Sequence, residues 1–289
     1  MNSTTYCLLK LLPKNAISRA FGNFTRMRIP ILSKFLAKMF ANHYKINMKE
    51  AQIPANGFAN IHELFIRKLK KGARIVEDNA EVVCPVDGVL TAFGMLLPNK
   101  QEYMQAKGKH YSLKSLLRNK ELAQKFAGGV YATVYLAPHN YHRIHSPVSG
   151  NVSMAYYCPG KLWPVNAGSV ERIEGLFSIN ERLITQISTY GGGEVLLVKV
   201  GATNVGRIAV EYKKDWFTNS MPPPGNRNSL FTKWEPESIH SYTKGQEIAR
   251  FEMGSTIILV CNSVILQRTK HLFATLEGRN VVMGQALMV

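Results

Sequence analysis

Two histidines stand three residues apart within the segment Tyr141–His145, after a β-like run and a proline turn. From a strand end or a loop, His142 and His145 can point into one pocket, and histidine is the side chain best suited to proton transfer near neutral pH. Two histidines that only make structural hydrogen bonds are the commoner outcome of this spacing. No Asp, Glu or Cys stands at ligand spacing, so metal binding is the weaker interpretation and we expect no metal site.

A second candidate is the aspartate of the pair Asp87-Gly88. The pair lies between the apolar runs Glu81–Val83 and Val89–Phe93, where Asp-Gly is first of all typical of a hairpin turn. An aspartate can also orient a histidine, as the acid does in a Ser-His-Asp arrangement. Asp87 is therefore a candidate partner for the two histidines.

The third candidate is the pair Gly254-Ser255, between the strand-like runs Glu247–Phe251 and Thr256–Leu266. A Gly-Ser pair between strands is most often a turn or a bulge. The Gly-x-Ser-x-Gly pattern of a hydrolase nucleophile elbow is absent. Because Gly254 has no side chain, the hydroxyl of Ser255 can approach the Gly254 carbonyl and the backbone can adopt strained conformations.

The elements that precede these candidates are helical. Residues 7–48 are expected to form amphipathic helices, and Pro30 suits the first turn of one of them. Beyond it, apolar residues recur at helical period, with Lys34 and Lys38 between them; they are Ile31, Leu32, Phe35, Leu36, Met39 and Phe40. The stripe fits an ordinary helix that faces a core, and it also fits a helix that lies in a membrane interface.

The charge of this segment favours the membrane alternative. Residues 1–50 contain nine Lys and Arg residues and one acid, Glu50. Each basic residue near an anionic leaflet adds roughly 1 kcal/mol of attraction. A solvated helix more usually mixes both signs of charge, so we expect residues 1–50 to associate with a membrane surface.

From about residue 60 the pattern changes to short apolar or alternating runs punctuated by Gly, Pro and Asn, which is typical of a β-rich domain. Short helices are expected at Ile61–Leu69 and Leu113–Lys125. The predicted class is α+β, with N-terminal amphipathic helices (residues 1–50) followed by a β-rich, mainly antiparallel catalytic domain (residues 51–289). The remaining expected strands are Val130–Leu136, Asn151–Tyr157, Leu183–Ser188, Glu194–Val200 and Gly206–Tyr212.

Composition narrows the function classes. The 289 residues are 46% hydrophobic and 19% charged, which predicts a packed core, and the net charge of +17 favours a polyanionic partner, either nucleic acid or an anionic membrane. The four cysteines are scattered, which indicates a reducing compartment. No secretory signal is visible, and the longest uncharged run, Met253–Gln267, is too short to span a bilayer comfortably.

In this order, the candidate motifs and several others resemble the phosphatidylserine decarboxylase family over roughly residues 55–285. Met253 and the pair His139-Asn140 depart from the family pattern without touching a candidate residue, and the first fifty residues match it in character only. The matching stretches are Phe58–Arg67, Cys84–Gly88, Lys107–Leu113, Tyr135–Pro138, Tyr141–His145, Trp163–Asn166, Leu176–Arg182, Val200–Gly206, Lys244–Ile248 and Phe251–Thr256.

The resemblance implies a proenzyme that makes its own cofactor. Asp87 would orient His145, and His145 would take the proton of Ser255, whose oxygen attacks the Gly254 carbonyl to replace the amide by an ester. Loss of the Ser255 α-proton then eliminates the Gly254 carboxylate. Hydrolysis of the resulting dehydroalanine releases ammonia and leaves a covalently bound pyruvoyl group. The products are a large chain of residues 1–254 and a small chain of residues 255–289.

The resemblance also implies the reaction and its setting. The pyruvoyl ketone would form a Schiff base with the amine of phosphatidylserine and accept the electrons released with carbon dioxide, giving phosphatidylethanolamine. His142 or His145 would protonate the carbanion, and His142 is favoured. The two chains would form a heterodimer, paired again as a homodimer. The enzyme would lie peripherally on the cytoplasmic side of a bacterial inner membrane and would not bind nucleic acid.

Three other functions remain open at this point. A serine hydrolase would use Asp87, His145 and Ser255 on an external ester and would stay one chain. A nucleic-acid-binding protein would use the net charge of +17, although the sequence has no recognisable recognition motif. A pyruvoyl enzyme could also act on another amine-bearing amino acid derivative, but the lysine-rich N-terminal helices favour a lipid.

Overall fold

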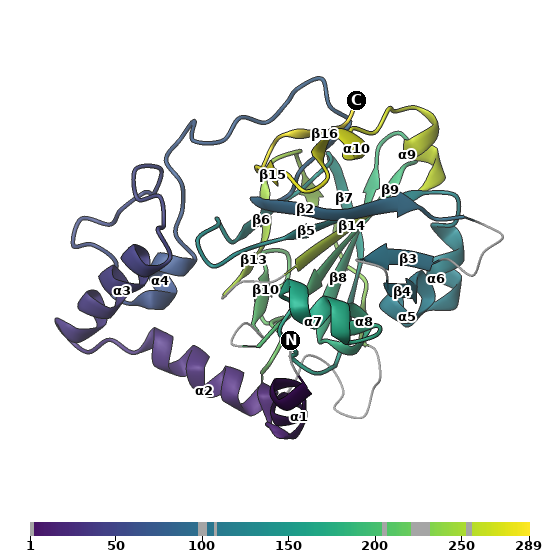
Figure 1. Cartoon of the computed structure of the whole chain (residues 1–289). Coiled ribbons are helices and arrows are strands. Elements are labelled where there is room, and N and C mark those ends of the chain that lie inside the picture. Colours follow the sequence, from purple (N-terminus) through teal and green to yellow (C-terminus); the bar gives the residue numbers. More distant parts are fainter. Residues whose placement is uncertain (1–2, 98–102, 107–108, 204–206, 221–231, 253–255) are drawn as a thin grey trace.

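The computed structural model describes residues 3–97, 103–106, 109–203, 207–220, 232–252 and 256–289. N-terminal helices precede a β-rich domain, and every strand pair in these ranges is antiparallel, so the predicted α+β class is confirmed (Figure 1). The helices are α1 (Ser3–Leu11), α2 (Lys14–Arg26), α3 (Leu32–His43), α4 (Ile61–Phe65), α5 (Leu113–Leu117), α6 (Lys120–Lys125), α7 (Ala167–Arg172), α8 (Leu176–Ile179), α9 (Ser263–Gln267) and α10 (Phe273–Leu276).

One large sheet forms the frame of the β-rich domain, in the order β11-β7-β8-β9-β14-β5-β2-β15, with β12 also paired to β7. A smaller sheet has the order β10-β13-β6, and β1-β16 and β3-β4 are separate pairs. The strands are β1 (Val82–Val83), β2 (Gly88–Met95), β3 (Tyr103–Ala106), β4 (Lys109–Ser112), β5 (Val130–Tyr135), β6 (Arg143–His145), β7 (Gly150–Cys158), β8 (Arg182–Thr189), β9 (Glu194–Val200), β10 (Ile208–Val210), β11 (Thr232–Trp234), β12 (Ser241–Tyr242), β13 (Glu247–Phe251), β14 (Thr256–Cys261), β15 (Asn280–Val281) and β16 (Ala286–Met288).

Strand β14 lies in the middle of the large sheet and is buried on both faces. Side chains alternate across a sheet, so Ile257 and Leu259 face one way and Ile258 and Val260 the other. The first pair packs in the cluster that includes the small sheet, and the second in the cluster that includes α5, α6, α7 and α8. This double burial explains why β14 reads as an unbroken apolar run rather than an alternating one.

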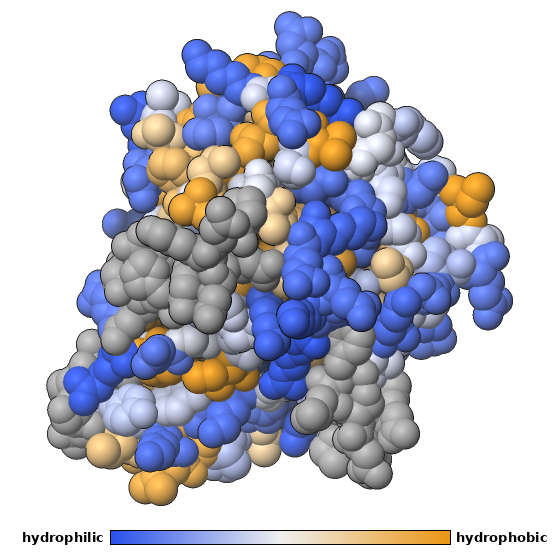
Figure 2. All heavy atoms as spheres, turned by 90° about the vertical axis from the view of Figure 1, so that its right-hand side faces the viewer, coloured by the Kyte–Doolittle hydropathy of each residue, from blue (hydrophilic) through white to orange (hydrophobic). Residues whose placement is uncertain are grey.

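Helix α3 divides its apolar stripe between two surroundings. Ile31, Phe35 and Met39 are 84%, 58% and 52% exposed. Leu36 is half-buried, and Phe40 packs against the cluster that Ala37 and Ala41 form with Leu64. The alternative of an ordinary core-facing helix therefore describes Phe40 but not the exposed positions. On the side of the molecule away from α3 and α4, hydrophilic side chains cover much of the surface, with smaller apolar groups between them (Figure 2). Within the described ranges, no helix combines the length and the apolar character needed to cross a membrane.

Two predicted elements have the wrong bounds, in each case because a helix N-cap residue begins a new helix. The predicted strand Thr256–Leu266 ends at Cys261, where the side chain of Asn262 accepts from the Ile265 amide and begins α9. The predicted helix Leu113–Lys125 is two helices, because Arg118 has a left-handed φ of 51° and Asn119 caps α6.

The expected Asp87-Gly88 hairpin does not form. Strand β1 pairs with β16, and β2 pairs with β5 and β15, so the two flanking runs are not partners. A Cβ atom on Gly88 would lie 2.4 Å from the Tyr135 carbonyl oxygen. Glycine at position 88 is thus explained by the close approach of β5 and not by a turn.

Candidate active site

The two histidines lie at opposite ends of one strand ladder. Strand β6 pairs with β13 so that His145 lies opposite Glu247. At the other end, the Phe251 amide donates to the His142 carbonyl oxygen at 2.9 Å. Since β13 runs from Glu247 toward residue 254, His142 lies at the end from which the chain continues to Gly254 and Ser255.

His142 is completely buried, and one of its ring nitrogens is open. Its Nδ1 lies 2.8 Å from the Asn140 carbonyl oxygen, which can only accept, so Nδ1 carries the hydrogen and Nε2 the lone pair. The Phe65 ring of α4 packs 4.0 Å from the imidazole, centroid to centroid. Nε2 has no hydrogen-bond partner in the described part of the chain. Burial, followed by the charge of Arg67, lowers the pKa of His142 to about 3, so the ring is a neutral base.

His145 has both ring nitrogens engaged. Nδ1 lies 2.7 Å from the Gly245 carbonyl oxygen, and Nε2 lies 3.0 Å from the Tyr141 hydroxyl. The carbonyl requires hydrogen on Nδ1, so Nε2 accepts from Tyr141. Burial lowers the pKa of His145, while the Gly245 hydrogen bond and the carboxylates Glu247 and Asp87 oppose that change.

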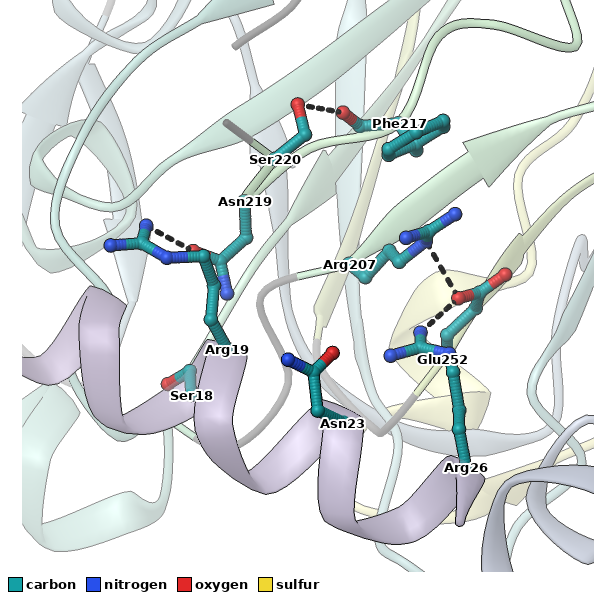
Figure 3. Close-up of a pocket in the computed structure, with 10 residues that line it drawn as sticks. Ser18, Arg19, Asn23, Arg26, Arg207, Phe217, Asn219, Ser220 and Glu252 are labelled. Carbon is teal, nitrogen blue, oxygen red and sulfur yellow. Dashed lines mark hydrogen bonds and ion pairs between the residues drawn. The ribbon is translucent and has the colours of Figure 1, made fainter. Parts of the chain in front are cut away.

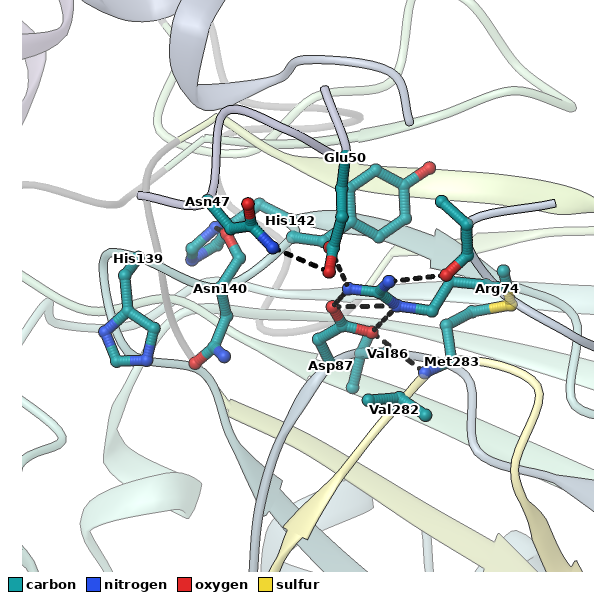
Figure 4. Close-up of polar contacts among 12 residues, drawn as sticks. Asn47, Glu50, Arg74, Val86, Asp87, His139, Asn140, His142, Val282 and Met283 are labelled. Carbon is teal, nitrogen blue, oxygen red and sulfur yellow. Dashed lines mark hydrogen bonds and ion pairs between the residues drawn. The ribbon is translucent and has the colours of Figure 1, made fainter. Parts of the chain in front are cut away.

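Asp87 is buried and accepts hydrogen bonds from two other groups (Figure 4). Arg74 Nε lies 3.0 Å from its Oδ1, and the Met283 amide donates to the same oxygen at 2.9 Å. Arg74 also pairs with Glu50 at 2.9 Å. The hydrogen bond that orients His145 is therefore made by Gly245, whereas Asp87 acts on His145 through its charge.

The predicted cleavage pair, Gly254 and Ser255, lies outside the described residues. Their neighbours on both sides are described. Glu252, buried at 5% exposure, follows β13, and Thr256 opens β14 between Tyr135 and Val200. The predicted cleavage position thus joins the small sheet to the centre of the large one, rather than linking two paired strands.

The start of β14 borders an apolar pocket of about 230 Å³. Tyr135, Val165 and Phe177 contribute to its wall together with Thr256. The Thr256 hydroxyl oxygen is buried and has no hydrogen-bond partner among the described residues. Apolar walls with a few polar atoms are typical of small-molecule sites. In the described part of the chain, no group of three or more His, Cys, Asp and Glu side chains could hold a metal ion.

The sequence alone did not point to the groups that hold the histidines. Arg74 was not singled out, although it is the main partner of Asp87. Gly245, Tyr141 and Arg67 stood inside recognised motifs without a role. Arg67 donates to the His139 and Asn140 carbonyls at 2.9 and 3.2 Å and so fixes the turn before His142. Backbone carbonyl partners carry no sequence signal, because every residue has one.

Comparison of the sequence with known proteins identifies its family. The family model described as phosphatidylserine decarboxylase matches residues 61–289, which include Asp87, both histidines and the Gly254-Ser255 pair. The chain belongs to the phosphatidylserine decarboxylase family. A second model, described only as PSD, matches residues 6–45 and so reaches the N-terminal helices.

Curated members of the phosphatidylserine decarboxylase family extend the match to nearly the whole chain. A phosphatidylserine decarboxylase proenzyme of Anaeromyxobacter sp. is 42% identical over 254 residues, 87% of each chain. That of Brevibacillus brevis is 36% identical over 97% of this chain and 95% of its own. That of Shewanella loihica is 35% identical over 99% and 98%. The word proenzyme in these names describes those proteins as precursors.

Proposed function

We propose that this chain is a phosphatidylserine decarboxylase that cuts itself between Gly254 and Ser255 and converts Ser255 to a pyruvoyl group. The observation that carries the decarboxylase part of the proposal is His142, a fully buried histidine whose Nε2 has no partner among the described residues and which lies beside the end of β13 that leads into this pair. Family membership supports the substrate. The test is release of carbon dioxide from carboxyl-labelled phosphatidylserine in vesicles, with free L-serine as the comparison substrate.

The architecture supports a cut that leaves the two chains together. Strand β14 would begin the small chain, and it is hydrogen-bonded to β5 on one side and β9 on the other. The same chain would contribute β15, paired with β2, and β16, paired with β1. Residues 255–289 would therefore stay bound to residues 1–254 as a heterodimer. We extend the proposal to a homodimer of such pairs, as the family resemblance implies.

For the cut, His145 is the proposed base. Its Nδ1 is held by Gly245, so Nε2 carries the lone pair, which accepts from the Tyr141 hydroxyl. To take the Ser255 proton, Nε2 would exchange the Tyr141 hydroxyl for the Ser255 hydroxyl. Burial and Arg143 disfavour the imidazolium formed in this step, and the nearby charges of Glu247 and Asp87 would partly offset that cost. The oxygen of Ser255 then replaces the amide nitrogen on the Gly254 carbonyl, and elimination and hydrolysis release ammonia.

Two buried polar atoms near the Gly254-Ser255 pair, His142 Nε2 and the Thr256 hydroxyl oxygen, have no hydrogen-bond partner among the described residues. They are therefore available to contact a pyruvoyl group formed from Ser255. Such a group supplies a ketone that condenses with the substrate amine and accepts the electrons left by carbon dioxide. The amine must be neutral to attack the ketone, and the Nε2 lone pair of neutral His142 would accept a hydrogen bond from it. Because the pKa of His142 is low, its imidazolium is a strong acid, so His142 would relay a proton from solvent to the carbon that has lost carbon dioxide without holding it.

The proposal also includes binding of the N-terminal helices to a membrane surface. Helices α1, α2 and α3 expose large apolar side chains beside an excess of lysine and arginine, which is how an interfacial helix is built. We propose that residues 1–50 bind the anionic surface on the cytoplasmic side of a bacterial inner membrane, and that residues 51–289 form the catalytic domain. The lipid head group would then reach the site while its acyl chains stay at the bilayer.

A further inference from the structure

A second pocket, of about 260 Å³, lies between α2 and the β-rich domain (Figure 3). Arg19 and Arg26 extend from α2 toward Arg207, Asn219 and Glu252 on the other wall. Glu252 stands three residues before Ser255 in the sequence. The pocket therefore borders the segment that would carry the reacting group, from a side different from that of the apolar pocket at Thr256.

The pocket has more positive than negative charge. Its single carboxylate, Glu252, pairs with Arg26 and with Arg207 Nε at 2.8 Å, and also lies 3.4 Å from Arg250. Burial alone would raise the pKa of Glu252. The positive charges of Arg207, His62 and Arg26 outweigh burial and lower this pKa, so Glu252 is ionised. Arg250 lies outside the pocket lining and pairs with Glu211 as well. Within the lining, the arginines Arg19, Arg26 and Arg207 face the single carboxylate Glu252, and this excess favours an anionic ligand.

Arg19 and Arg207 are the arginines with capacity left for such a ligand. Arg19 donates to the neutral amide oxygen of Asn219 at 3.2 Å. It influences the buried acid Glu181 through space, without an ion pair within 4.0 Å among the described residues. The guanidinium of Arg207 lies over the Phe217 ring, 3.7 Å from its centroid, which fixes its plane. A fixed guanidinium loses little entropy when its terminal nitrogens bind a phosphate oxygen.

The position of α2 indicates where the anion comes from. The helix turns its polar face, with Arg19 and Asn23, into the pocket, while Ile17 and Phe24 on it are 37% and 48% exposed. An amphipathic helix of this kind rests at the boundary between head groups and acyl chains. The pocket then lies at head-group depth, which favours a lipid phosphodiester over a free phosphate from solution.

We propose that Arg19 and Arg207 bind the phosphodiester of the phosphatidylserine head group. The inference rests on the proposed function and adds the substrate contact that it lacks. In this head group, an ester oxygen and two carbons separate the phosphorus from the amine. Holding the phosphate beside Glu252 would direct the amine and carboxylate toward the segment that contains Ser255.

The test is a titration of the purified full-length protein with glycerophosphoglycerol, a phosphodiester without an amine, followed by ³¹P line broadening. Arg19→Gln and Arg207→Gln should each weaken binding about tenfold or more, since each removes a charged hydrogen-bond donor. The matched control is Arg279→Gln, an exposed arginine beside β15, which should bind as the parent does. Equal binding by all four proteins overturns the proposal.

Two further measurements separate the alternatives. Arg207→Lys keeps a cation beside Glu252 and should fold with an unchanged Tm and an intermediate affinity. Inorganic phosphate is titrated in parallel: binding that depends on Arg19, without binding of glycerophosphoglycerol, overturns the lipid assignment.

Turnover of phosphatidylserine in vesicles keeps this proposal distinct from the proposed function. If the head-group site is correct, Arg19→Gln raises KM and leaves kcat within about twofold, because uniform binding is lost. A parent protein that releases no carbon dioxide would overturn the decarboxylase function, while arginine-dependent binding of glycerophosphoglycerol would still support the phosphodiester site.

Discussion

His142 and His145 are the same residue type three positions apart, yet the fold gives them opposite surroundings. His145 is held at both ring nitrogens, by Gly245 and Tyr141, and lies near the carboxylates Glu247 and Asp87. His142 is held at one nitrogen only, packs against Phe65 and has a positive neighbour, Arg67.

This difference indicates a division of labour. Burial and Arg143 lower the pKa of His145, but the Gly245 carbonyl and the carboxylates Glu247 and Asp87 partly offset that change, which suits a base that must take up a proton once. No carboxylate offsets the burial of His142 and the charge of Arg67, so a proton that reaches its Nε2 would be passed on readily. One pair of histidines can therefore serve a self-cleavage step and a turnover step, because environment and not residue type sets the pKa.

The largest expected effect is that of His145→Asn. Without the base, the chain should stay uncut and decarboxylation should be lost with it, at least 100-fold. Gel analysis of the purified variant measures the cut, and carbon dioxide release measures turnover. His43→Asn, on the exposed face of α3, is the matched control and should be cut like the parent. A His145→Asn protein that is cut at the parent rate contradicts the role given to His145.

His142→Asn should separate the two steps. We expect normal cleavage and a loss of turnover of about 10²- to 10⁴-fold, the usual range for removal of a general acid–base group. Mass analysis and carbon dioxide release on the same sample provide both readouts. An uncut His142→Asn chain would mean that the division between the histidines is wrong.

Asp87→Asn tests whether charge acts on His145 from a distance. Removal of this carboxylate should slow cleavage about tenfold or more, because one of the charges that favour the His145 imidazolium is lost. Glu50→Gln is the matched control, since Glu50 shares Arg74 with Asp87 but is not among the groups that act on His145. Equal slowing by both variants would show that Asp87 works only by holding Arg74.

The effect that is smallest at neutral pH is on stability, and it comes from the lowered pKa of His142. Its pKa is about 3 in the folded chain against 6.5 for the ordinary side chain. Between these values the unfolded chain binds the extra proton, so stability falls as pH drops from 6.5 toward 3, by up to about 1.4 kcal/mol per pH unit.

Urea unfolding at several pH values checks this slope. It is best done in the Ser255→Ala chain, which is expected to stay in one piece. Adding His142→Asn should reduce the slope below pH 6.5, while His62, whose pKa is lowered to about 4 by burial, still contributes to it. If the free energy of unfolding depends on pH equally with and without His142, burial does not lower the pKa of this residue.

The sequence predicted the elements whose pattern is strong and local. Runs such as Glu194–Val200 and Glu247–Phe251 match β9 and β13 at both ends, because short runs rich in apolar residues and set off by glycine turns have few alternatives. The helix α9 was missed because its apolar residues continue the run of β14, and only the cap at Asn262 separates the two.

The site was predictable as residue types but not as contacts. His142, His145 and Asp87 were found by their chemistry and by family resemblance. The strand register that puts His142 next to Phe251, and the choice of Gly245 rather than Asp87 as the partner of His145, depend on tertiary pairing. Such pairing joins residues about a hundred positions apart, which no local pattern encodes.

The central claim is self-processing at Gly254-Ser255, and the intact mass of the freshly purified protein tests it most directly. We predict two chains, residues 1–254 and residues 255–289, with the small chain lighter by one ammonia than a fragment that begins with serine. A single uncut chain from a well-folded preparation would contradict the pyruvoyl mechanism and move the serine hydrolase alternative to first place.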